Sequence, residues 1–75
     1  MTKKELKRVF VKEFIKWKNM YNGNLSLSQI TRDFDITYKK LTLLINELIK
    51  EKFIQIRNCD AFCYELTKSE RNKYL

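Results

Sequence analysis

The apolar residues of this chain change their spacing at Phe53, and the change restricts the fold to a mixture of helices and strands. Before Phe53, apolar residues recur every three or four positions, which is the period of a helix. After it, the segments FIQIRN and FCYELT are rich in β-branched and aromatic residues, and the turn-prone residues 58–61 separate them. The sequence therefore predicts an α+β protein that is mainly helical and carries a two-stranded β-hairpin.

Helix-capping patterns predict where the helices begin. A serine or threonine followed three residues later by Glu or Gln is typical of a capping box, and three such pairs occur: Thr2 with Glu5, Ser26 with Gln29, and Thr67 with Glu70. Thr37 also suits the N-cap position. Gly23, the only glycine of a chain without proline, marks the clearest break. We therefore predict helices over residues 3–21, 26–34 and 37–52 and, after the hairpin, a short helix that runs to residue 75.

Length and charge limit the classes of function. A chain of 75 residues is expected to form a single domain, residues 1–75. Sixteen Lys and Arg residues against nine Asp and Glu residues give a net charge of +7, which favours polyanionic partners such as nucleic acid. Apolar runs are too short for a membrane span, and no signal peptide is recognisable. We expect no membrane partner and a cytoplasmic location, on the nucleoid if the source is prokaryotic or viral.

The composition argues against catalysis. The chain has no histidine, so the usual general base is missing, and Cys59 and Cys63 have no histidine companion for a metal site or a cysteine nucleophile. We therefore expect a protein that is not an enzyme and that uses no metal or cofactor. In an intracellular protein the two cysteines are expected to be reduced thiols. A disulfide between chains, or within one chain of a hyperthermophile, stays an alternative.

The stretch LSLSQITRDFDITYKKLTLLINELIKEKFIQI, followed by CYELTKSE, resembles a winged helix-turn-helix. It is most similar to small transcriptional regulators of the MarR type and their archaeal and viral relatives, over residues 25–70. The resemblance implies a short helix, a three-residue turn, a recognition helix, a two-stranded wing and a further helix. The family's apolar positions fall on Ile30, Phe34, Ile36, Leu41, Leu44 and Leu48, its closing pair on Phe53 and Ile54, and its restart on Leu66 and Thr67.

Two residues depart from the pattern of that family. Asp35 stands in the turn and Lys52 stands after the recognition helix, where glycine is usual. Aspartate tolerates a left-handed backbone, so the turn is expected to form. Lys52 predicts that the third helix enters the wing without a glycine-type cap. The wing carries one cation, Arg57.

The resemblance implies that the third helix, residues 37–52, lies in the major groove of double-stranded DNA. Asn46 suits bidentate contact with adenine, Thr42 offers a donor or acceptor, and Lys39 and Lys40 suit guanine or phosphate. The candidate DNA-binding residues are Thr37, Tyr38, Lys39, Lys40, Thr42, Leu43, Asn46 and Lys50, with Arg57 in the wing. The alternative for each is an ordinary solvated side chain.

Leu43 lies on the polar side of the third helix, opposite the apolar side. It has three interpretations: contact with a thymine methyl group, an anchor for a protein partner, or an ordinary exposed leucine. The second interpretation belongs to an alternative function, in which the same surface docks on a transcription or replication factor.

Val11 and Ile15 lie outside the main apolar arc of the first helix. Excess apolar surface suggests a partner, and the family often pairs through its first and last helices. We therefore expect a homodimer whose interface contains Val11, Ile15, Tyr74 and Leu75, presenting two recognition helices to a palindromic site. The alternative is that Val11 and Ile15 pack beneath the terminal helix of the same chain.

Overall fold

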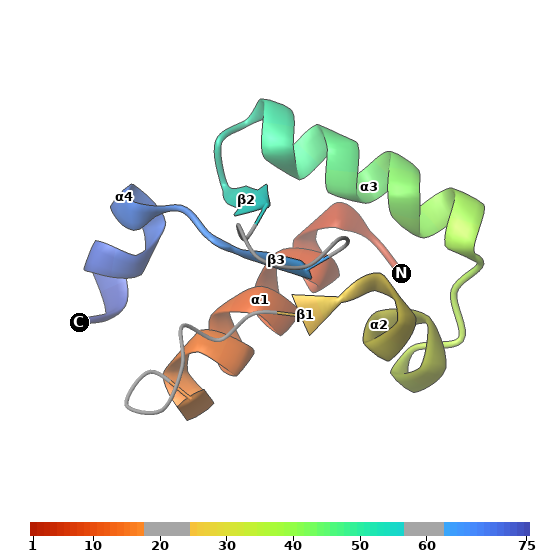
Figure 1. Ribbon diagram of the computed structural model, residues 1–75, viewed down its shortest axis with the longest axis horizontal. Helices are drawn as coiled ribbons and strands as arrows, with labels where there is room; N and C mark the ends of the chain where they lie inside the picture. The colour runs from red at the N-terminus through yellow and green to blue at the C-terminus, as the bar shows by residue number, and fades with distance from the viewer. Residues whose placement is uncertain (18–24, 57–62) are drawn as a thin grey trace.

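The computed structural model describes residues 1–17, 25–56 and 63–75. Within these ranges the chain is mainly helical with a small antiparallel sheet, which confirms the predicted α+β class (Figure 1). The elements in chain order are α1 (Lys3–Trp17), β1 (Leu25–Ser26), α2 (Leu27–Asp33), α3 (Tyr38–Lys50), β2 (Ile54–Ile56), β3 (Cys63–Leu66), α4 (Lys68–Arg71) and the 3-10 helix η1 (Asn72–Tyr74). The predicted end of the first helix, residues 18–21, lies outside the described residues. Across the described ranges, no helix combines the length and the apolar character that a membrane span requires.

Two of the three predicted capping boxes form. The backbone N–H of Thr2 donates to Glu5 Oε1 at 3.0 Å, and the N–H of Glu5 donates to Thr2 Oγ1 at 3.2 Å. Ser26 and Gln29 make the same reciprocal pair at 3.1 and 3.3 Å. These bonds satisfy N–H groups that have no partner inside the helix, so they specify where α1 and α2 begin.

The third predicted capping box, Thr67 with Glu70, is wrong. Thr67 occupies the N-cap position of α4 but makes no side-chain capping bond. Its hydroxyl instead donates to the carbonyl oxygen of Lys52 at 2.8 Å. A tertiary contact thus replaces the local cap and connects the start of α4 to the end of α3.

The end of α3 corrects a second prediction, because Lys52 does form a glycine-type cap. Lys52 has a φ of 62°, in the left-handed region. Its N–H donates to the carbonyl of Ile49 at 2.9 Å, and the N–H of Phe53 donates to the carbonyl of Leu48 at 3.0 Å. This pair of bonds is the Schellman motif, which usually places glycine where Lys52 stands. Asp35, with a φ of 34°, confirms the left-handed turn predicted before α3.

Replacing Lys52 with glycine is expected to stabilise the protein. A residue with a Cβ atom pays a steric penalty in the left-handed region, which glycine avoids while losing more backbone entropy on folding. The net gain is expected to be about 0.5 to 1 kcal/mol in the free energy of unfolding, measured by urea denaturation followed by circular dichroism. Lys52→Ala keeps the Cβ atom and serves as the control. Equal stability of the two variants contradicts the strain at this position.

The sheet contains a strand that the sequence pattern did not predict. Its order is β1-β3-β2, and both pairs are antiparallel. The predicted hairpin strands β2 and β3 pair Ile54 with Leu66 and Ile56 with Tyr64. The unexpected strand β1 pairs Leu25 with Tyr64 across the other edge of β3. A strand of two residues is too short to show an alternating pattern in the sequence, so β1 is recognised only by its pairing with β3.

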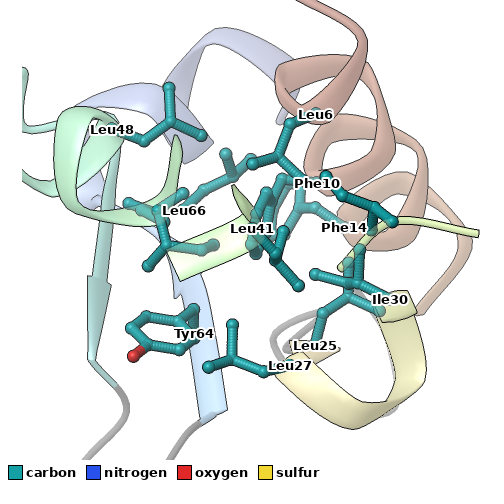
Figure 2. Packing of buried hydrophobic residues seen from close by; sticks show 13 residues of the cluster. Leu6, Phe10, Phe14, Leu25, Leu27, Ile30, Leu41, Leu48, Tyr64 and Leu66 are labelled. Carbon is teal, nitrogen blue, oxygen red and sulfur yellow. The ribbon is translucent and has the colours of Figure 1, made fainter. Parts of the chain in front are cut away.

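The core lies between α1, α3 and the inner face of the sheet, with α2 closing one end (Figure 2). Its buried members are Leu6, Phe10, Phe14, Leu25, Leu27, Ile30, Ile36, Leu41, Ile45, Leu48, Ile54, Tyr64 and Leu66. Phe34, predicted as a core position, is 43% exposed. It is the C-cap of α2, and the chain turns there before it reaches the core again at Ile36. Leu44, also predicted as a core position, is half-buried at the core edge.

Candidate nucleic-acid interface

The orientation of α3 follows from its two faces. Leu41, Ile45 and Leu48 are almost completely buried against the core. Because a helix turns about 100° per residue, residues on the far side of that apolar face must point into solvent. Thr37 caps the helix, since its Oγ1 accepts from the N–H of Lys40 at 3.3 Å.

Four exposed residues form a stripe along the solvent face of α3: Lys39, Leu43, Asn46 and Lys50. Their spacing of four, three and four residues keeps them on one side of the helix. Lys40 and Glu47 flank the stripe, and both are exposed. Leu43 lies at its centre with 62% of its surface exposed. It borders a shallow hollow that Lys40, Leu44, Asn46, Glu47 and Lys50 also line.

The stripe and the flanking Lys40 have uncompensated positive charge. Lys39, Lys40 and Lys50 make no ion pair with any residue that the structure describes. Glu51 follows the helix, but Lys3 and Lys7 pair with it from α1, the second at 3.1 Å. Hydrogen bonds from Lys3 and then Lys7 hold the pKa of the Glu51 carboxyl below its ordinary value. Lys3 and Lys7 of α1 thus neutralise the carboxylate charge of Glu51. Glu47 remains the acidic residue beside the stripe.

Two hydroxyl groups of the predicted set already make bonds within the helix. Thr42 is half-buried, and its hydroxyl donates to the carbonyl of Tyr38 at 2.8 Å, a bond to the preceding turn that threonine often makes. Thr37 accepts the capping bond from Lys40. Thr42 therefore keeps an acceptor for a base edge, while its proton is committed to the helix.

Tyr38 is the first residue of α3 and lies near Tyr64 of β3. It is 55% exposed. Burial chiefly raises the pKa of the Tyr64 phenol, and the nearby Tyr38 phenol raises it further. Ile56, paired with Tyr64 in the sheet, is 62% exposed. Sequence reasoning missed Ile56 as a surface residue, because the alternation in IQI places it on the same face as the buried Ile54.

Of the residues predicted for the wing contact and for the dimer interface, those that the structure describes do not gather at one place. Arg57 lies outside the described residues, as does Cys59, so the wing contact stays a prediction. Val11 and Tyr74 are half-buried at the core edge and line one groove. Ile15 is 50% exposed and Leu75 is 81% exposed. The predicted dimer interface is therefore divided between two groove residues and two exposed residues, and it also stays a prediction.

Comparisons with protein-family models, with curated proteins and with solved structures found no match to this chain.

Proposed function

We propose that this protein is a winged-helix protein that binds double-stranded DNA in a sequence-specific manner and regulates transcription, with α3 in the major groove. The observation that carries the proposal is the exposed stripe of α3, in which two unpaired lysines surround Leu43 and Asn46. The left-handed turn at Asp35 between α2 and α3, and the antiparallel strands β2 and β3 that follow α3, support the winged-helix part of the proposal.

The stripe supplies the chemistry that a major groove accepts. The amide of Asn46 can donate to and accept from one adenine edge, and the methyl groups of Leu43 can contact a thymine methyl group. Lys39 and Lys50 can reach phosphates or guanine from either side. Glu47 repels phosphate, so the part of α3 before Glu47, which includes Lys39, Leu43 and Asn46, is expected to enter the groove, with Lys50 at its edge.

A second candidate function is docking on a transcription or replication protein through the same face. The observation that favours it is the 62% exposure of Leu43 beside a shallow hollow. An apolar side chain at the centre of a polar surface is the arrangement that interface anchors often have.

A salt titration tests the DNA proposal directly. Lys39, Lys40 and Lys50 of α3 are expected to contact DNA phosphates and release the counterions condensed on them. The logarithm of the affinity is therefore expected to fall linearly with the logarithm of the salt concentration, with a slope of about −2 to −3 per bound chain. Fluorescence anisotropy with a mixed-sequence duplex gives this slope. Lys50→Ala is expected to reduce its magnitude by about 1, whereas Lys16→Ala on α1 leaves it unchanged. Absence of binding to any duplex at low salt contradicts the proposal.

A further inference from the structure

A second surface of the molecule combines positive charge with an apolar floor. It is a groove of about 340 Å³ between α1 and the C-terminal turn η1. We call it the α1–η1 groove, and its lining residues are Lys4, Lys7, Arg8, Val11, Lys12, Phe53 and Tyr74. The first helix, α1, is rich in cations. The structure gathers four of them along this groove.

The charges of the α1–η1 groove have one sign. Within residues 1–17, 25–56 and 63–75, none of the residues that line it is acidic. Lys7 is engaged with Glu51 and lies over the Phe53 ring, with its Nζ 5.0 Å from the ring centroid. Lys4 and Lys12 make no ion pair within the part of the chain that the structure describes. Their charges are therefore available to a partner.

The floor of the groove is apolar, and packing against the core and a backbone hydrogen bond fix its position. Val11, Phe53 and Tyr74 are half-buried and pack against the core. Backbone bonds hold Phe53, whose carbonyl accepts from the N–H of Thr67 at 3.1 Å.

The helical turn η1 forms one wall of the groove, and an ion pair attaches the start of this turn to the sheet. Arg71, just before η1, pairs with the buried Glu65 of β3 at 3.3 Å. Gln55 donates to the other carboxylate oxygen of Glu65 at 3.1 Å. A groove formed in advance lowers the conformational cost of binding.

We propose that the α1–η1 groove binds an acidic amphipathic segment of a partner protein. Carboxylates of such a segment pair with Lys4, Arg8 and Lys12, while its apolar side chains cover Val11, Phe53 and Tyr74. The phosphate backbone of a nucleic acid offers charge but no apolar group for this floor. A second copy of this chain, docked groove to groove, would place cations against cations, which is unfavourable without screening.

The α1–η1 groove and the stripe of α3 share no residue. In Figure 1, α3 lies along the upper side of the view and α1 crosses beneath it. The acidic segment and the duplex would therefore contact different residues, so the two kinds of binding can be measured separately.

The test uses the full chain and a fluorescein-labelled helical peptide in which glutamates flank a face of leucine and phenylalanine. A matched peptide with glutamine in place of every glutamate is the neutral probe. Fluorescence anisotropy is expected to show binding of the acidic peptide, and binding of the neutral peptide at least about tenfold weaker, as expected for loss of charge pairs at an interface rim.

Two variants locate the binding. The charge reversal Lys4→Glu with Lys12→Glu is expected to weaken the acidic peptide by about tenfold or more. The control Arg32→Glu with Lys68→Glu makes the same change in net charge at exposed residues outside the groove, and is expected to weaken it much less. Tyr74→Ala, which removes part of the floor near the chain end, is expected to weaken it by about tenfold as well.

Three outcomes overturn the proposal: equal binding of the two peptides, equal effects of the two charge reversals, or a Tyr74→Ala variant that binds like the parent. Two further outcomes assign the groove to another occupant and also overturn it. One is a concentration-dependent dimer in sedimentation equilibrium that Tyr74→Ala abolishes. The other is a loss of duplex affinity on reversing Lys4 and Lys12 as large as the loss of peptide affinity. The DNA titration above is a separate measurement, so either proposal can fail alone.

Discussion

Replacing Phe10 with alanine is expected to leave most of the protein unfolded in buffer at room temperature. Phe10 is completely buried in α1 and belongs to the cluster that joins α1 to α3 and the sheet (Figure 2). Removing a buried phenylalanine side chain costs about 3 to 5 kcal/mol, from lost burial and from the cavity left behind. A core in a chain of this size rarely supplies more than about 3 to 5 kcal/mol in total. Far-UV circular dichroism and urea denaturation measure the loss.

Phe34→Ala provides a matched control, because it makes the same chemical change at a residue that is 43% exposed. Its cost is expected to be below about 1 kcal/mol, as for other changes away from a packed core. If Phe34→Ala destabilises the protein as much as Phe10→Ala does, Phe10 is not at the centre of the core.

Replacing Lys39 and Asn46 together with alanine is expected to reduce duplex affinity by about 100-fold while the thermal melt stays unchanged. A bidentate contact to a base contributes about 1 to 3 kcal/mol of discrimination, and Lys39 adds a charged contact beside it. Both side chains are exposed, so their loss leaves no cavity. Anisotropy titrations with a duplex selected from a random pool measure the affinity, and circular dichroism measures the melt.

The control for this variant is Lys16→Ala with Asn72→Ala, which removes the same side-chain types at exposed positions away from α3. It is expected to keep most of the affinity. Leu43→Ala separates the two candidate functions of the stripe: under DNA binding it lowers affinity for a thymine-containing site, and under protein docking it abolishes partner capture with little change in DNA affinity. Equal losses in the double variant and in its control contradict the assignment of α3 as the recognition helix.

Periodicity and capping chemistry were sufficient to predict the α+β class, the faces of α3 and the starts of α1 and α2. These features depend on residues that are three or four positions apart, such as Ser26 and Gln29, so the signal and the structure lie in the same segment. The stripe containing Leu43 and Asn46 was predictable for the same reason, since burying Leu41, Ile45 and Leu48 leaves the opposite face exposed.

Contacts between distant segments decided the rest. Strand β1 forms because Leu25 pairs with Tyr64. The hydroxyl of Thr67 donates to the carbonyl of Lys52 instead of capping α4. Lys52 takes a left-handed conformation because the chain must turn from α3 into β2 there. The α1–η1 groove likewise joins residues from both ends of the chain. The sequence by itself determined the local conformational preference of each segment. The tertiary structure decided which of these preferences the folded chain keeps, because a long-range contact outweighs a local preference of about 1 kcal/mol.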